Sequence, residues 1–160
     1  MTERDHAHDT EDLTTRIGQV IMLLHGGDRE EARNRFAALW SELAVGGDLF
    51  HQVTVAHYMA DAQDDPAAEL AWDLRALGAA QALTETEVSW GGHAIAVRAL
   101  YPSLYLNLAA DYLKLRDRSA ARRELDRCQA VLGTLDDDAY GNGVRAAAAR
   151  LETRLSADPS

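Results

Sequence analysis

His57 and Asp61 are the side chains whose types and spacing best suit chemistry, because residues four apart on a helix share one face. Such a pair can hold a metal ion or relay a proton, and His51 precedes it by about two helical turns. A zinc or acid–base site needs about three convergent groups, and no motif in the chain fixes a third one. A surface ion pair, or a histidine bonded across a helix interface, accounts for the spacing more simply. We therefore predict no catalytic residue, no metal ligand and no cofactor.

Sequence motifs for the common catalytic and nucleotide-binding chemistries are absent from the chain. It contains no GxxxxGK[ST] phosphate loop, no HExxH zinc motif, no GxSxG nucleophile turn and no CxxC pair. We therefore expect a protein that is not an enzyme. The alternative is a small helical metal- or ligand-binding protein, or an enzyme, that uses His57 and Asp61. Trp90 and His93, on either side of Gly91-Gly92, are read first as part of a packed insertion and second as ligand contacts.

Length and charge restrict the classes of partner. The chain has 160 residues, the size of one domain, and a formal net charge of −10, which argues against nucleic acid and anionic membranes. The first residues are polar and no run of about 18 apolar residues occurs, so we expect a cytoplasmic protein. Lys114 is the only lysine, a bias toward arginine that is typical of a GC-rich bacterial genome. The single cysteine, Cys128, lies on an apolar stripe and is expected to be a small buried hydrophobe.

The stretch 102–133 predicts two amphipathic helices of about a dozen residues each, separated by Arg116-Asp117-Arg118. Its residues also follow a longer pattern, which runs aromatic, Asn, Leu, small, Tyr, Asp, Ala, bulky apolar and small. The positions that carry this pattern are Tyr105, Asn107, Leu108, Ala109, Tyr112, Asp117, Ala121, Leu125 and Cys128. The stretch therefore resembles one tetratricopeptide repeat. We expect Tyr112 and Leu125 to be buried where its two helices cross.

Helical periodicity in every apolar segment, with capping signals at the expected helix starts, predicts an all-α fold with no sheet. The resemblance implies that antiparallel helical hairpins stack as a short right-handed α-solenoid. We expect a disordered tail at residues 1–9 and a single domain at 10–157, with hairpins at about 10–45, 48–80 and 102–132. Asp28 with Glu31 predicts a capping box at the second helix. In the second hairpin two registers remain open. One uses Tyr58, Ala67 and Leu74, and the other uses Met59, Ala68 and Trp72.

Two further segments lie outside the three hairpins. The capping-box pattern from Thr84 to Glu87 predicts an extra helix at about 84–100, inserted before the third hairpin. The acidic run 136–138 precedes a predicted capping helix at about 139–156, which would cover the last hairpin.

Across the tetratricopeptide family, such arrays are protein-interaction scaffolds that hold a peptide or helix in a concave groove lined by the first helix of each hairpin. The resemblance therefore implies a non-catalytic adaptor or regulatory scaffold that binds a protein or peptide segment. The net charge favours basic or apolar segments, and a homodimer is left open. One subclass clamps a carboxylate with Asn, Lys and Arg from successive hairpins, a set that is incomplete here. The residues predicted to contact a partner are His57, Asp61, Ser103, Asn107, Ala110 and Lys114.

Overall fold

The structure, a computed structural model, describes the backbone of residues 3–157 and the side chains of residues 12–157. Seven α-helices run through this part of the chain, so the prediction of a mainly helical protein is confirmed. They are α1 (Glu3–His25), α2 (Arg29–Leu43), α3 (Leu49–Asp61), α4 (Pro66–Gln81), α5 (Tyr101–Lys114), α6 (Arg118–Val131) and α7 (Ala139–Ser156). None of the helices in the described residues combines the length and the apolar character needed to cross a membrane.

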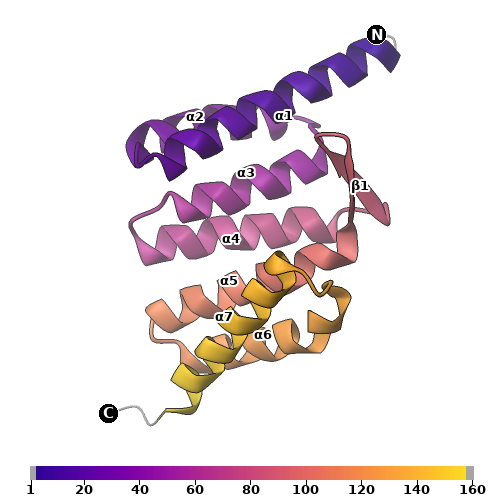
Figure 1. Cartoon of the computed structure of the whole chain (residues 1–160). Helices are drawn as coiled ribbons and strands as arrows, with labels where there is room; N and C mark the ends of the chain where they lie inside the picture. Colours follow the sequence, from indigo (N-terminus) through magenta and orange to yellow (C-terminus); the bar gives the residue numbers. More distant parts are fainter. Residues whose placement is uncertain (1–2, 158–160) are drawn as a thin grey trace.

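Consecutive helices pack as antiparallel neighbours in successive layers. The pairs α1–α2, α3–α4 and α5–α6 are in contact, and α2–α3 and α4–α5 join one pair to the next. Figure 1 shows these helices in layers, with α7 crossing α5 and α6 at a steep angle. α7 contacts both of those helices, which agrees with the position expected for a helix that covers the last hairpin.

Three apolar clusters form the core, and each is shared by neighbouring helices. The first joins α1, α2 and α3 around the fully buried Phe36, and the second joins α3, α4 and α5 around Leu108. The third joins α5, α6 and α7 around Leu125 and Cys128, both of which are 0% exposed. Burial raises the pKa of the Cys128 thiol to about 11, as expected of a residue that serves only in packing.

Tyr112 differs from its predicted position. It is half-buried, and the guanidinium carbon of Arg123 lies 5.7 Å from the centre of its ring. The prediction of burial is therefore confirmed for Leu125 and wrong for Tyr112. The tyrosine lies at the edge of the second apolar cluster, where the cation covers its outer face.

Aspartate side chains cap most of the helices at their first turn. Asp48, Asp65, Asp117 and Asp138 each accept a hydrogen bond from the backbone N–H three residues later, at 2.7–3.1 Å. Asp28 stands at the same position before α2 but makes no such bond. Glu31, its expected capping-box partner, pairs with Arg35 at 2.8 Å instead.

The segment 84–100 contradicts the predicted extra helix. It forms an antiparallel hairpin of β1 (Glu87–Trp90) and β2 (His93–Ala96), followed by a short 3-10 helix at Val97–Leu100. Trp90 pairs with His93, so only Gly91 and Gly92 make the turn, and both have positive φ (55° and 80°). A two-residue turn of this kind requires positive φ at both positions, which glycine adopts without strain. The expectation of a chain without strands is therefore also wrong.

The N-terminal segment differs from expectation as well. α1 begins at Glu3, so the backbone of residues 3–9 is helical where a disordered tail at 1–9 was expected. Met1 and Thr2 lie outside the described residues.

Candidate binding site

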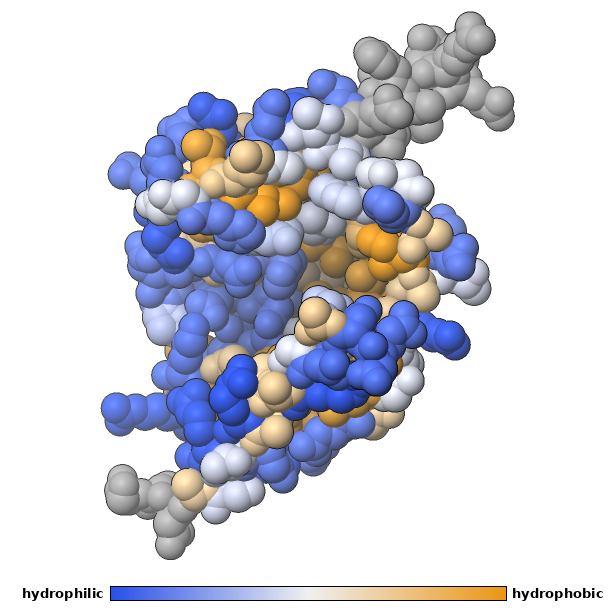
Figure 2. Space-filling view, viewed as in Figure 1, coloured by the Kyte–Doolittle hydropathy of each residue, from blue (hydrophilic) through white to orange (hydrophobic). Residues whose placement is uncertain are grey.

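An apolar pocket opens where α1, α3 and α5 approach the β-hairpin and the start of α7. Its volume is about 280 Å³, and Figure 2 shows apolar surface in the hollow between α7 and the hairpin. α3, the first helix of the second pair, contributes more lining residues than any other element. The lining residues are Ile21, Phe50, Val53, Thr54, His57, Tyr58, Trp90, Leu100, Ser103, Leu104 and Tyr140.

His57 supplies a polar group in this wall and is joined to α5. Its Nδ1 lies 3.2 Å from the side-chain nitrogen of Asn107, and the ring packs edge-on against Tyr58 at 4.9 Å between centroids. Because the Asn107 amide donates to Nδ1, the neutral ring carries its proton on Nε2. Nε2 is 3.8 Å from Asp61, which is beyond hydrogen-bond distance. The imidazole is therefore fixed by Asn107 and only loosely associated with Asp61.

Ser103 and Tyr140 close one side of the pocket. Their hydroxyl groups form a hydrogen bond that joins α5 to the first turn of α7. Tyr140 nevertheless remains 58% exposed, so its ring is a large apolar surface available at the pocket mouth.

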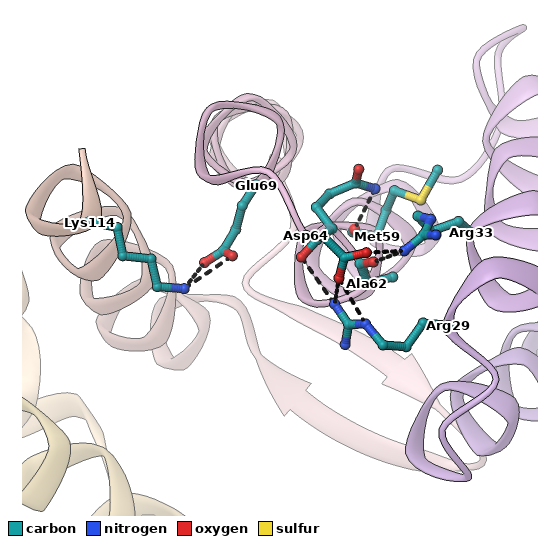
Figure 3. Close-up of polar contacts among 8 residues, drawn as sticks. Arg29, Arg33, Met59, Ala62, Asp64, Glu69 and Lys114 are labelled. Carbon is teal, nitrogen blue, oxygen red and sulfur yellow. Dashed lines mark hydrogen bonds and ion pairs between the residues drawn. The ribbon is translucent and has the colours of Figure 1, made fainter.

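The other predicted contact residues are spread over different surfaces. Asp61 is exposed, one helical turn beyond His57, and is not part of the pocket wall. Ala110 lies with Asn107 in a separate cleft between α5 and α7. Lys114 reaches α4, where its Nζ lies 2.8 and 3.1 Å from the two carboxylate oxygens of Glu69 (Figure 3). The structure thus brings His57 and Ser103 into one pocket, with Asn107 behind it, and places Asp61, Ala110 and Lys114 elsewhere.

His51 does not join His57 and Asp61. It is 2% exposed, and its Nε2 lies 3.2 Å from the Thr14 hydroxyl of α1. Its ring packs edge-on against Trp90, with 5.9 Å between centroids. His51 therefore ties α3 to α1 and to the β-hairpin, and the three groups considered for a metal or proton relay do not converge.

Three carboxylates outside the predicted set of site residues are buried or half-buried. Glu69 and Asp73 on α4 and Asp111 on α5 place one oxygen each within 4.8 Å of the others. Burial raises the pKa of both Asp73 and Asp111, and for Asp111 the neighbouring carboxylates raise it further. An acidic residue four positions from another on a largely apolar helix was the available signal, because such spacing brings both to one face.

The pocket residues Phe50 and Val53 were not among the predicted contact residues, and Trp90 was expected only as a second choice for ligand contact. α3 is apolar around most of its circumference, with buried side chains on several faces. A helix of this kind packs on both sides, and the sequence alone does not show which side stays partly uncovered. Trp90 enters the wall only because its segment forms a β-hairpin and not the predicted helix.

Comparison with protein-family models and with curated proteins finds no match for this chain.

Proposed function

We propose that the chain is a non-catalytic protein-interaction module, an adaptor or regulatory scaffold, whose three helix pairs stack as a short right-handed α-solenoid of the tetratricopeptide type. The order of the helix contacts supports this, because each pair packs internally and against the next. The partner is a protein or peptide segment, and the location is the cytoplasm. Neither nucleic acid nor a membrane is expected as a partner, given the net charge of −10.

The main support for this proposal is the apolar pocket lined by residues of α1, α3 and α5, the first helices of the three pairs. Its floor is apolar, with Phe50, Val53 and Leu104, while His57 and Ser103 supply polar groups. Its volume of about 280 Å³ lies just below the range of about 300–1,000 Å³ typical of sites for drug-sized ligands. A space of this size suits one or two side chains of a bound segment. We infer that an apolar anchor residue of the partner inserts here, as amphipathic segments do in hydrophobic grooves.

A metal-binding or enzymatic role for His57 and Asp61 has less support. Nε2 of His57 and Oδ2 of Asp61 are 3.8 Å apart, and Nδ1 of His57 is already engaged by Asn107. Among the described residues, the one group of three side chains with metal-ligand spacing includes neither of them.

A pocket-filling substitution tests the proposed binding mode. Thr54 lines the pocket and its hydroxyl donates to the carbonyl of Phe50, one turn back. Thr153 on α7 makes the same bond to Ala149 outside the pocket, which makes it a matched control. Peptides are selected by display against the wild-type protein, and their affinities for Thr54→Phe and Thr153→Phe are compared by fluorescence anisotropy.

We expect the selected peptides to share an apolar anchor and to bind Thr54→Phe at least about tenfold more weakly, with no change for Thr153→Phe. Equal affinity for both variants would place the contact outside the pocket and overturn the proposal. Light scattering on the same samples tests a second copy of the chain as the occupant. A wild-type dimer that Thr54→Phe converts to monomer would identify it.

A further inference from the structure

The buried carboxylates at the junction of the second and third helix pairs form a compact group. Glu69 and Asp73 are four residues apart on α4, and Asp111 faces them from α5. One oxygen from each lies within 4.8 Å of the other two. Asp73 is 3% exposed and Asp111 is 1% exposed, so water cannot solvate these charges as it does on the surface.

Two oxygens of this group have no hydrogen-bond partner. They are Oδ1 of Asp73 and Oδ2 of Asp111, both fully buried. An ionised carboxylate accepts hydrogen bonds and donates none, so the three groups cannot satisfy one another while all are charged. A proton shared between two of the carboxyl groups, or a cation bound by all three, would relieve this conflict.

The surrounding cations do not balance the charge. Lys114 donates its hydrogen bonds to Glu69 and acts on Asp73 and Asp111 only through its charge. His57 lies near enough to favour the charged form of Asp73, but Asp61 and Glu69 act in the opposite direction. If all three carboxylates are ionised, Lys114 balances Glu69 and two formal negative charges remain, which is the charge that one divalent cation neutralises.

The donor set and its dimensions suit a hard cation. All donors are carboxylate oxygens, the ligands that Ca²⁺, Mg²⁺ and Mn²⁺ prefer. Oxygens bound to a single Ca²⁺ at about 2.3–2.6 Å are at most about 5 Å apart. The three oxygens already satisfy this limit. The side chain of Glu69 is 18% exposed and offers a path for the ion and for the waters that complete its coordination.

We propose that Glu69, Asp73 and Asp111 form a binding site for a single hard divalent cation, which joins α4 to α5. This site goes beyond the proposed protein-binding function, because it lies between the helix pairs and not on the pocket wall. The competing occupant is a proton shared between the aspartates, which would make the cluster purely structural.

Titration with Mn²⁺ distinguishes the two occupants. The protein is dialysed against a chelator and then against buffer at about pH 7.5, and free Mn²⁺ is measured by electron paramagnetic resonance. We expect one ion per chain with a Kd below about 1 mM, competition by Ca²⁺, and a rise in Tm on saturation. Asp111→Asn should weaken binding at least about tenfold. Asp137→Asn, the same change in the exposed acidic run before α7, should leave it unchanged.

Two results would overturn the proposal. One is the absence of Mn²⁺ binding to the wild-type chain below about 1 mM, which needs no variant and shows that protons occupy the cluster. The other is Mn²⁺ binding that is as tight in Asp111→Asn and in Asp73→Asn as in the wild type, with folding checked by circular dichroism. That result would show that the ion binds at another site. Neither measurement involves a protein partner, so each result is independent of the proposed function.

Discussion

The side-chain nitrogen of Asn107 on α5 lies 3.2 Å from Nδ1 of His57 on α3, so the first helices of the second and third pairs are joined by a polar contact. His57 lines the apolar pocket, and Asn107 sets which ring nitrogen carries the proton. The orientation of the imidazole toward a ligand in the pocket therefore depends on a residue of the neighbouring helix pair.

Replacing Asn107 by Ala should weaken partner binding while leaving the Tm nearly unchanged. The His57 side chain is 30% exposed, so water can replace the lost hydrogen bond, and we expect a loss of no more than about 1 kcal/mol in unfolding free energy. Affinity for a display-selected peptide and thermal melting measure the two effects. Asn34→Ala, on the exposed side of α2, is the control. A large fall in Tm with unchanged affinity would make Asn107 a structural residue alone.

Leu125→Ala should lower the unfolding free energy by about 2–4 kcal/mol, because it removes a fully buried side chain from the α5–α6–α7 cluster and leaves a cavity. Urea denaturation measures this change. Leu115→Ala, at a position that is 40% exposed, should cost less than about 1 kcal/mol. Equal effects of the two substitutions would contradict the packing described for this cluster.

The buried His51 should make stability fall as the solution is acidified. Burial lowers the pKa of His51 in the folded state, although the Asp48 carboxylate 3.7 Å from Nδ1 acts in the opposite direction. Below the unfolded-state pKa of about 6.5, the unfolded chain takes up a proton that the folded chain resists, so the unfolding free energy decreases. The loss ends once the pH falls below the lowered folded-state pKa.

His51→Gln removes this group and allows its contribution to be measured by difference. Urea denaturation of both proteins between about pH 5 and pH 7.5 should show a wild-type stability that falls more steeply with acidification. Parallel curves would mean that His51 keeps its ordinary pKa in the folded protein.

Gly92→Ala should destabilise the β-hairpin, because the φ of +80° at this position places an added Cβ in the left-handed region. The expected cost is about 1–2 kcal/mol in unfolding free energy. Gly133→Ala is the matched control, since its φ is ordinary and no heavy atom lies within 4 Å of an added Cβ. Hydrogen exchange of the 87–96 amides should increase in Gly92→Ala, and protection equal to wild type would exclude the two-residue turn.

The sequence predicted the helices better than the segment between them. The three helix pairs and α7 lie close to the predicted hairpins and capping helix, because apolar periodicity and aspartate caps are signals carried by residues near one another in the sequence. The hairpin was missed although Val88, Trp90 and Ile95 alternate around Gly91-Gly92, since Thr84 and Glu87 matched a helix-start pattern. The two glycines favour a tight β-turn over a continuous helix, because both adopt a positive φ that a helix does not use.

The candidate site was only partly predictable, for a different physical reason. Two of the predicted contact residues, His57 and Ser103, line the pocket, and Asn107 bonds to His57. The pocket also needs Trp90 and Tyr140, which tertiary packing brings from distant segments. Asp111 gave no sign of its burial, because a charged residue on a helix is usually on the surface. Its acidic neighbours, Glu69 and Asp73, lie on α4, and only the packing of α4 against α5 brings the three carboxylates together.

The ion pair between Lys114 and Glu69 has a practical consequence for chemical labelling. Lys114 is the only lysine in the chain, so an amine-reactive ester finds a single ε-amino group, at the junction of α4 and α5. The hydrogen bond to Glu69 raises the pKa of this amine, which keeps it protonated and slow to acylate. A cation that draws Glu69 away would release the amine and speed its acylation. The rate at which Lys114 is acylated, followed by mass spectrometry, therefore reports whether Glu69 is still paired with Lys114.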